Sequence, residues 1–485
     1  IRPPTTIPRQ APDMTTLRFH GSAAVLLLPL ALFVAVTARL FISEAAFDLT
    51  GLAAAGVLTL FSGSLLAKAP SEYWKAAVRG ASSELTGTVV LILIASGIFS
   101  AMMKASGVAD GLVFLGGMLH LTGHAFTVFV LLASSLMAAA TGSSIGTLLA
   151  AMPIFFPAGV ALGADPAMLA GAMLSGAIFG DNLAPVSDVT VISSVTQRFR
   201  DGTPADIAGV VRTRLPYAMT ALAVSMPVYA FMGASRPVSE AALSGDASAL
   251  LMLVPVAVLI AVAVRTRDVL MAISAGTVTG TATGLLIGRL SFATIFAADD
   301  GRLSGFLISG ISNVSPIILL CVTLFAFTGI VREAGVPDMM AKALEAGSAG
   351  RPSALRTELF LSAATLVVTT LFAAVTSASV ALVGSLTDDI GRASNVHPYR
   401  RSHILSGLAN SLPVLMPFSA FVLITMAAVS GLEGAAAVTP FTLMTAAFYP
   451  IALFLVFGFM VLTGTGRMME TPEPEAAEAK TATAL

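Results

Sequence analysis

Residues 166–197 form an apolar stretch that is long enough to cross a lipid bilayer but carries charges in its middle. At about 1.5 Å of rise per residue, Asp181 lies near the halfway depth of such a span. Pro185 has no backbone N–H and disfavours helix in the residue before it, so the sequence predicts a broken helix there. A charge at the bilayer centre costs roughly 2.5–3.5 kcal/mol even on a lenient insertion scale. The stretch therefore predicts a carboxylate that meets a cation, a proton or water, as in the ion site of a transporter.

The composition predicts a polytopic membrane protein, because the chain is 56% hydrophobic and only 11% charged, with a mean hydropathy of +0.90. Cys321 is the single cysteine and lies in an apolar run, which excludes a disulfide within the chain and predicts a small buried side chain. We expect no nucleic-acid partner, because there is no basic domain. The sequence shows no catalytic triad, metal-binding His/Cys spacing or phosphate-binding glycine loop, so we expect no enzyme and no cofactor.

Ten apolar runs predict full membrane spans: 22–43, 50–67, 84–104, 166–197, 215–234, 249–265, 269–290, a run ending at Val331, 402–430 and 441–463. Two further pairs of apolar arms are short for a crossing. The first pair, 124–140 and 144–161, is joined by Thr141-Gly142-Ser143-Ser144, and the second is joined by Thr376-Ser377-Ala378-Ser379. Neither join carries a charge, so we expect two re-entrant hairpins with tips inside the membrane. The piece 108–120 is expected to lie flat at the interface.

The two halves of the chain resemble each other. Thr141–Ser144 recurs as Thr376–Ser379 at an offset of 235, and Ala105–Val108 recurs as Glu333–Val336 at an offset of 228. Ser175-Gly176 and Pro185-Val186-Ser187 recur as Ser406-Gly407 and Pro417-Phe418-Ser419, at offsets of 231 and 232. We predict this organisation: a disordered tail (1–21), scaffold helices (22–83), a first repeat (84–234), a connecting loop with scaffold helices (235–303), a second repeat (304–463) and a disordered tail (464–485).

An odd number of crossings separates the two predicted repeats, so their topologies should be inverted. Placing both termini in the cytoplasm puts 21 of the 26 Lys and Arg residues on the inner side, including the predicted loop 198–214 and the segment 392–401. This bias predicts a multi-pass protein of the cell inner (plasma) membrane. Inverted repeats whose broken helices meet at mid-depth are typical of secondary transporters. The fold class is therefore an all-α membrane protein with about ten membrane helices, two re-entrant hairpins and two inverted repeats.

The candidate ion and substrate ligands come from the two breaks and the two hairpin tips. Carboxylates, hydroxyls and unwound carbonyls are oxygen ligands that suit an alkali cation, and a proton would compete with Na⁺ for a desolvated carboxylate. Asp181 is the best placed by depth; Asp188 is a second ligand, a relay nearer the inner mouth, or a residue in cytoplasmic water. The second break carries no acid, so it is either a neutral counterpart or a buried kink. The candidates are Asp181, Asn182, Ser187, Asp188, Thr141, Gly142, Ser143, Ser144, Thr376, Ser377, Ser379, Asn410 and Ser411, with Asp181 and Asp188 as the Na⁺ ligands.

Other polar residues are expected at the membrane faces. Asp388 and Asp389, beside Arg392, predict a solvated cluster at the inner rim. His120, His124, His397 and His403 lie near span ends and are expected at the interfacial surface.

Ser175-Gly-Ala-Ile-Phe-Gly-Asp181-Asn-Leu-Ala-Pro-Val-Ser-Asp188 resembles the Ser-Gly-Ala-x-Phe-Gly-Asp-x-x-Ser-Pro-x-Ser-Asp segment of NhaC-type Na⁺/H⁺ antiporters. Thr141-Gly-Ser-Ser-Ile-Gly-Thr147 is similar to that family's Thr-Gly-Thr-Ser-x-Gly-Thr, and Pro398-Tyr-Arg-Arg401 with Ser406-Gly407, Asn410 and Pro417 is similar to its C-terminal repeat. The resemblance spans about 84–463 and implies the ion-transporter superfamily fold and a homodimer.

The chain departs from the pattern of that family at three positions. Asn182 replaces its Lys, Ala184 its Ser and Val189 its Thr. The resemblance implies a Na⁺/H⁺ antiporter whose partners are Na⁺, protons and membrane lipid. The family also includes exchangers of malate and lactate, so an ion-coupled transporter of a small organic anion or amino acid is the alternative.

Overall fold

The computed structural model describes residues 17–21, 23–40, 49–234, 246–266, 268–299, 302–336 and 353–470. The predicted disordered tails lie largely outside these ranges, as do residues 337–352. The chain divides into two compact units, one of residues 1–87 with 319–343 and one of residues 88–318 with 344–485. Two long helices, α4 (Glu84–Ser106) and α14 (Phe306–Glu333), contribute to both units.

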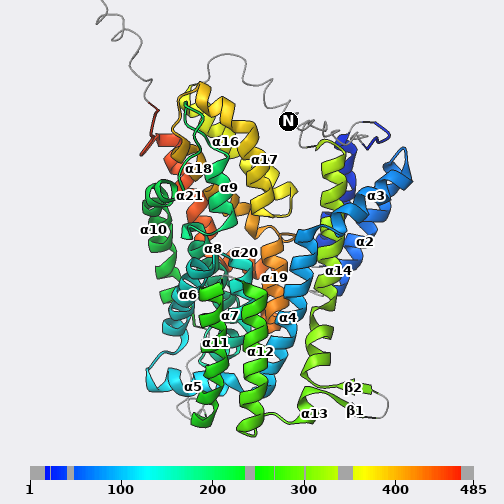
Figure 1. The fold of residues 1–485 in the computed structure, drawn as a ribbon, viewed down its shortest axis with the longest axis vertical. Coiled ribbons are helices and arrows are strands. Elements are labelled where there is room, and N and C mark those ends of the chain that lie inside the picture. Colours follow the sequence, from blue (N-terminus) through cyan, green and yellow to red (C-terminus); the bar gives the residue numbers. More distant parts are fainter. Residues whose placement is uncertain are drawn as a thin grey trace, which may run out of the picture. The chain divides into compact units, whose positions relative to one another are not determined.

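The smaller unit is a helical layer around one apolar core, shown at the blue end of the colour scale in Figure 1. Its elements are η1 (Ala23–Leu26), α1 (Leu27–Ala38), α2 (Leu49–Leu66), α3 (Pro70–Ala81), the start of α4 and the end of α14. Tyr73 is fully buried in the core, where its hydroxyl donates to the Leu60 carbonyl at 2.9 Å. Cys321 is buried as predicted.

The larger unit contains the predicted hairpins and broken helices. Its first part comprises α5 (Val108–Met118), α6 (Gly123–Thr141), α7 (Ser144–Ala161), α8 (Pro166–Leu183), α9 (Asp188–Val195), α10 (Ile207–Met232), η4 (Ala247–Met252), α11 (Leu253–Thr266), α12 (Val269–Leu286), α13 (Phe292–Ile295) and the antiparallel strands β1 (Ala297–Asp299) and β2 (Arg302–Ser304). Its second part comprises α16 (Ala354–Leu371), α17 (Thr376–Ala393), α18 (Pro398–Ala409), η5 (Leu412–Leu415), α19 (Ala420–Val429), η6 (Ala435–Ala437), α20 (Pro440–Ala446) and α21 (Phe448–Thr463).

Within this unit, Figure 1 places α16 and α17 at the upper end, and α6 and α7 below them. Helix α5 lies crosswise to the long helices at the lower end of this unit and packs against η4 and α7 (Figure 1). Its position at the membrane interface stays a prediction. The short β1–β2 hairpin was not predicted, but it does not change the fold class.

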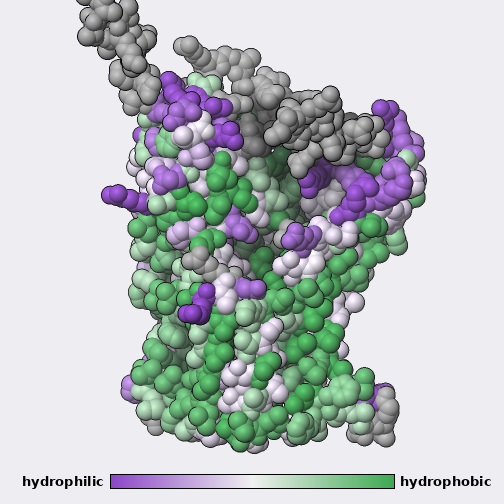
Figure 2. Space-filling model, viewed as in Figure 1, coloured by the Kyte–Doolittle hydropathy of each residue, from purple (hydrophilic) through white to green (hydrophobic). Residues whose placement is uncertain are grey.

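Nine helices of the described residues are long and apolar enough to cross a membrane, or up to eleven if each of two bent pairs forms one span. Figure 2 shows hydrophobic side chains over α11 and α12, and hydrophilic ones gathered at the upper end of the larger unit. Val278 and Leu286 on α12 are 71% and 87% exposed, which is costly in water and favourable in lipid. The predicted all-helical membrane fold is confirmed. Both α6 and α7 pass the same length test, so their re-entrant character stays a prediction.

Helix boundaries recur along the larger unit at a constant spacing of 232 residues. Helices α7 and α17 are each 18 residues long, and their first residues are Ser144 and Thr376. The pair α8 and α18 begins at Pro166 and Pro398, and the pair α9 and α19 begins at Asp188 and Ala420. This recurrence supports the predicted internal repeat, while the inverted relation of its halves stays a prediction.

The predicted join of the second hairpin was wrong. Thr376–Ser379 forms the first turn of α17, and the chain turns instead at residues 372–375, where Ala373 and Ala374 have φ angles of 51° and 60°. The sequence comparison matched Thr141 to Thr376, whereas the helix boundaries match Ser144 to Thr376.

Three spans are broken within the described residues. The break between α8 and α9 falls at Pro185 as predicted, and the break between α18 and α19 falls at the predicted 410–419 segment, where the chain bends by 54°. The third break, a 53° bend between α20 and α21, was not predicted. Pro450 explains it, because a proline lacks the N–H that would bond the carbonyl four residues earlier, and its ring clashes with that carbonyl. The freed carbonyl, Ala446 O, accepts instead from the hydroxyl of Tyr229 at 2.8 Å.

Candidate functional site

The first broken helix lies against α6 through two glycines four residues apart. A Cβ atom at Gly176 would lie 2.2 Å from Leu131 O, and one at Gly180 would lie 2.0 Å from Ser135 O. Only glycine permits this approach of two helix backbones, a mode of packing common between membrane helices. The contact holds the end of α8 beside the end of α6, and so brings the first break to the first hairpin tip.

The hairpin tip touches the break directly. Gly142 ends α6 with a φ of 69°, and a Cβ atom there would lie 2.7 Å from Val186 Cγ2 and 3.0 Å from Ser187 N. Ser143 then caps α7, because its side chain accepts from Gly146 N at 3.0 Å. The tip therefore has the geometry predicted from Thr141-Gly142-Ser143-Ser144.

Asp181 is buried at this junction, with 6% of its surface exposed. The hydroxyl of Ser144, the first residue of α7, donates to Asp181 Oδ2 at 2.8 Å, and the Ser187 side chain also interacts with the carboxylate. Asp181 Oδ1 is buried and has no hydrogen-bond partner among the described residues. A buried carboxylate oxygen without a partner is costly unless water, a proton or an ion meets it.

Two amide side chains at the breaks also lack hydrogen-bond partners within the described part of the chain. Asn182 donates through Nδ2 to Tyr449 OH at 3.3 Å, while its Oδ1 has no partner. Both amide atoms of Asn410 are buried without a partner. Ser411, by contrast, is satisfied by the Leu408 carbonyl at 2.7 Å. Each of the two breaks thus carries buried amide or carboxylate atoms without a partner among the described residues.

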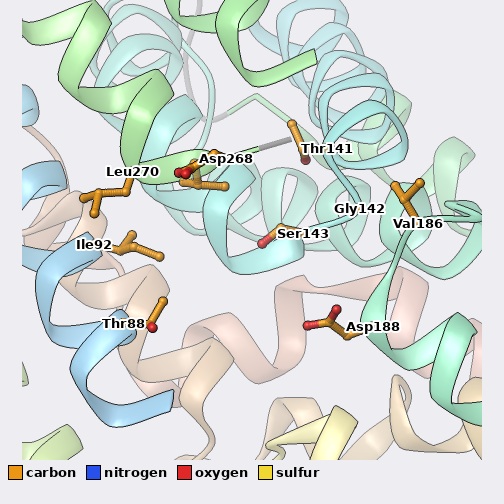
Figure 3. A pocket seen from close by; sticks show the side chains of 10 residues that line it. Thr88, Ile92, Thr141, Gly142, Ser143, Val186, Asp188, Asp268 and Leu270 are labelled. Carbon is orange, nitrogen blue, oxygen red and sulfur yellow. The ribbon is translucent and has the colours of Figure 1, made fainter. Parts of the chain in front are cut away.

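A cavity of about 440 Å³ opens beside the first hairpin tip (Figure 3). Its polar lining includes two carboxylates, Asp188 at the start of α9 and Asp268 at the start of α12, and no Lys, Arg or His lines it. Asp188 is exposed there, which agrees with a position nearer a membrane face than Asp181. Asp268 was not singled out from the sequence; it caps α12 by accepting from Met271 N at 2.9 Å.

The remaining lining residues of this cavity come from α4, the hairpin tip, the first break and α12: Thr88, Ile92, Thr141, Gly142, Ser143, Val186, Val269 and Leu270. The predicted residues of the second hairpin do not join this site. Ser379 is satisfied by the Val375 carbonyl at 2.9 Å, and among the described residues no hydrogen bond joins Thr376, Ser377 or Ser379 to Asp181.

Arg214 is the functional candidate that sequence reasoning missed. The predicted loop extended to residue 214, but α10 begins at Ile207, because Asp206 caps it by accepting from Gly209 N at 2.6 Å. Arg214 is fully buried and donates to two hydroxyls, Thr190 Oγ1 on α9 at 2.9 Å and Ser406 Oγ on α18. It interacts electrostatically with Asp181. An arginine at the end of an apolar span looks cytoplasmic in sequence, so no sequence signal separates Arg214 from a loop residue.

Asp388 is not the solvated rim residue that was predicted. Its side chain is buried, with 7% of the residue exposed. It accepts hydrogen bonds from Arg401 Nη1 at 2.6 Å and from the backbone N–H of Arg198 at 2.8 Å. It also forms an ion pair with Arg392 at 3.3 Å. Arg401, fully buried, also donates to Gln197 Oε1 at 3.0 Å. These bonds join α17, α18 and the loop after α9. The side chain of Asp389 lies outside the described residues.

The neighbouring Arg400 makes a separate buried ion pair. Its Nε lies 3.0 Å from Oε1 of Glu358, and both side chains are fully buried. Arg467 pairs with the same carboxylate at 2.9 Å, so the cluster joins α16, α18 and the segment that follows α21.

Of the four predicted interfacial histidines, His120 and His124 are exposed and His397 is half-buried. His403 is 1% exposed and its Nε2 lies 2.6 Å from Thr213 Oγ1, so the prediction of a surface position was wrong for His403. The cause is that the second broken span begins at Pro398 instead of residue 402, which moves His403 one turn into the helix.

No group of three or more His, Cys, Asp or Glu side chains gathers as a metal site among the described residues. A monovalent cation does not require one, because hydroxyls and backbone carbonyls at a broken helix supply oxygen ligands. The arrangement at Asp181 is therefore suited to a weakly held, exchangeable cation or proton.

Residues 14–234 match the profile of the Na⁺/H⁺ antiporter family. The chain is 33% identical over 158 residues to the Malate-2H(+)/Na(+)-lactate antiporter of Bacillus subtilis, a match that covers 33% of this chain and 32% of that protein. It is 39% identical over 104 residues to the Na(+)/H(+) antiporter NhaC of Alkalihalophilus pseudofirmus, covering 21% of this chain and 22% of that one. The chain thus matches only a third or less of the length of these relatives.

Among solved structures, this chain is similar to the YdaH transporter of Alcanivorax borkumensis, with a TM-score of 0.38 and 12% sequence identity. The match covers 77% of this chain and 85% of that chain. That score is too low to carry an argument about this chain.

Proposed function

We propose that this chain, whose residues 14–234 match the Na⁺/H⁺ antiporter family, exchanges Na⁺ for H⁺ across the membrane by alternating access. One observation carries the proposal. Asp181 is buried where a hairpin tip meets a broken helix, with one carboxylate oxygen bonded to Ser144 and the other free. A free, desolvated carboxylate oxygen in a membrane helix favours the binding of a proton or a cation.

In this mechanism Na⁺ and a proton compete for the same carboxylate. Na⁺ would bind Asp181 Oδ1 together with the unpaired Asn182 Oδ1, the Ser187 side chain and carbonyls of the break. Ser144 keeps the carboxylate oriented through its bond to Oδ2. When a proton takes the carboxylate, the cation loses its only charged ligand and leaves. Exchange then requires only that the site face each side of the membrane in turn.

The acidic cavity beside the hairpin tip supports a cation as the cargo. Two carboxylates, Asp188 and Asp268, line it without a basic residue, so its potential attracts cations and repels organic anions. We assign Asp188 the role of a relay or recruiting residue at this mouth, because it is exposed whereas Asp181 is buried.

The wider assembly is part of the proposal. We place the protein in the cell inner membrane with both termini in the cytoplasm, on the basis of the Lys and Arg distribution. We also propose a homodimer, as the family resemblance implies, and the six-part domain organisation given above with its two inverted repeats.

The rival function is transport of a small organic anion such as malate or lactate. Arg214 is the observation that favours it, because a buried guanidinium without a carboxylate partner would suit a carboxylate cargo. The acidic lining of the cavity argues against it.

A proteoliposome assay separates the two functions. Purified protein is reconstituted with a pH-sensitive dye inside, and a Na⁺ gradient is applied at fixed external pH. We expect Na⁺-driven proton movement in the native protein, no such movement in Asp181→Asn, and normal movement in the control Asp201→Asn, whose carboxylate lies in an exposed loop. Uptake of labelled malate or lactate without any response to Na⁺ would establish the rival instead.

A further inference from the structure

Arg214 is a buried positive charge whose hydrogen-bond partners among the described residues are both neutral. It is fully buried in α10 and donates to the hydroxyls of Thr190 and Ser406, and its Nε has no partner among the described residues. Transferring a guanidinium out of water is expensive unless a negative charge compensates it. Within the described part of the chain, no carboxylate lies within the 4 Å of an ion pair.

The two other fully buried arginines of this region are compensated directly. Arg400 lies 3.0 Å from Glu358, and Arg401 lies 2.6 Å from Asp388. The absence of such a partner at Arg214 is therefore specific to this position and not a general property of the packing. Tyr449 and, to a smaller extent, Asp181 act on Arg214 electrostatically, and of the two only the carboxylate carries a full negative charge at neutral pH. The geometry agrees, because Thr190, which accepts from Arg214, lies three residues after Ser187, whose side chain contacts the Asp181 carboxylate.

Arg214 also touches both broken spans. Thr190 lies in α9, just after the first break, and Ser406 lies in α18, just before the second. An ion that enters or leaves Asp181 changes the charge that Arg214 experiences, and Arg214 is bonded to the two elements that carry the breaks. The charge state of the site and the position of these helices are thus linked through one side chain.

We propose that Arg214 is the built-in counter-charge of Asp181, a positioning residue that keeps cation binding weak enough for release and transmits the charge of the site to α9 and α18. This inference rests on the proposed function. With Arg214 present, the Asp181–Arg214 pair is electrically neutral when empty and carries one positive charge when loaded. Without it, the empty site would carry an uncompensated negative charge and would hold Na⁺ tightly.

A role for Arg214 as the binding group for an anionic cargo fits the geometry less well. Two of its five N–H groups are bonded to hydroxyls on α9 and α18, and Arg214 is not among the residues that line the cavity at the hairpin tip. The cavity at the hairpin tip presents carboxylates, so an anion would have to pass negative charge to approach.

The test compares Na⁺ affinity in charge variants of the purified full-length protein, using ²²Na⁺ binding in detergent and the proteoliposome assay. We expect Arg214→Gln to bind Na⁺ about tenfold more tightly, equivalent to about 1.4 kcal/mol, and to turn over more slowly because release is impeded. Arg214→Lys should return the affinity to within about threefold of the native value. Gln retains hydrogen-bond donors, so a purely structural role would leave Na⁺ affinity unchanged in Arg214→Gln, and that result would overturn the proposal.

Arg212→Gln is the matched control, because Arg212 lies two residues earlier on the same helix and is exposed. Its removal takes away the same charge at the surface and should leave Na⁺ affinity within about twofold. An equal tightening in both variants would mean that net charge alone is responsible, and would also overturn the proposal.

A thermal-stability cycle tests the inference without any transport. Each single change, Asp181→Asn or Arg214→Gln, leaves one buried charge uncompensated, so the double variant should melt at a higher temperature than the sum of the single losses predicts. Additive losses would overturn the proposal even if Arg214→Gln folds poorly. If the native protein shows no Na⁺/H⁺ exchange, the proposed function fails; if it exchanges normally and only the cycle is additive, the counter-charge inference alone fails.

Discussion

Gly142 lies against Ser187 so closely that a Cβ atom on the glycine would be 3.0 Å from the serine backbone nitrogen. This contact joins the tip of the first hairpin to the break in the first broken helix. It places Ser144, two residues beyond Gly142, where its hydroxyl reaches Asp181 at 2.8 Å. The candidate ion site is therefore held together by backbone packing before any charge is considered.

Gly142→Ala should destabilise the protein and impair ion exchange. The residue has a φ of 69°, which costs roughly 1–2 kcal/mol for a residue with a side chain, and the new methyl group would also meet Val186 and Ser187. Thermal unfolding in detergent and the proteoliposome assay measure the two effects. Gly202→Ala is the control, because Gly202 has a φ of 85° but nothing within 4 Å of an added Cβ atom. Equal losses in the two variants would show that the tip contact is unimportant.

Ser144→Ala should weaken Na⁺ binding without abolishing it. The change removes the hydrogen bond to Asp181 Oδ2 and leaves the carboxylate less well oriented; a hydrogen bond to a charged group is worth about 1.5–3 kcal/mol. We expect the Na⁺ concentration for half-maximal exchange to rise at least about tenfold. Ser64→Ala, which removes an exposed hydroxyl bonded to Phe61 O, serves as the control. An unchanged half-maximal concentration would remove Ser144 from the site.

Tyr229→Phe should destabilise the third broken helix. The hydroxyl donates to Ala446 O at 2.8 Å and accepts from Phe448 N at 2.9 Å, so its loss leaves a buried carbonyl and a partly buried N–H unpaired. An unpaired buried group costs about 1–3 kcal/mol. The melting temperature in detergent should fall by several degrees. Tyr217→Phe loses a single bond to Thr465 O at 3.4 Å and should change little. Equal melting temperatures for both variants would contradict the role given to Tyr229.

Glu358→Gln should be among the most damaging single changes in the larger unit. Glu358 and Arg400 are fully buried, and removing the carboxylate charge leaves two arginines without their partner. Breaking a buried ion pair in this way costs about 3–5 kcal/mol. The yield of folded protein after detergent extraction and its melting temperature are the readouts. Glu72→Gln, in an exposed pair with Lys75, should show no measurable change. A native-like melting temperature for Glu358→Gln would show that the cluster is dispensable.

Local sequence chemistry predicted much of the fold and of the first half of the site. Pro185 predicted where α8 ends, and Thr141-Gly142-Ser143-Ser144 predicted the first tip, because a proline or a left-handed glycine acts on the backbone within a few residues. The second tip failed because matching threonine to threonine gave a register of 235 instead of 232. Pro450 could have revealed the third break, since it removes a hydrogen bond from Ala446 by the same rule.

The burial of charged side chains could not be predicted from the local sequence. The distribution of Lys and Arg placed Arg214, Arg400 and Arg401 at the cytoplasmic surface of the membrane. All three are fully buried instead. Their partners, Thr190, Ser406, Glu358 and Asp388, belong to other helices, so burial depends on contacts that the local sequence does not encode.

By itself the sequence determined that this is a helical membrane protein with a carboxylate in a broken span, because hydropathy and proline act locally. Only the tertiary structure decided which groups meet that carboxylate: Ser144 directly, Arg214 at a distance, and an acidic cavity beside the tip. The physical reason is that electrostatic and packing energies depend on distances between elements, and those distances exist only once α6, α8, α10 and α18 have packed.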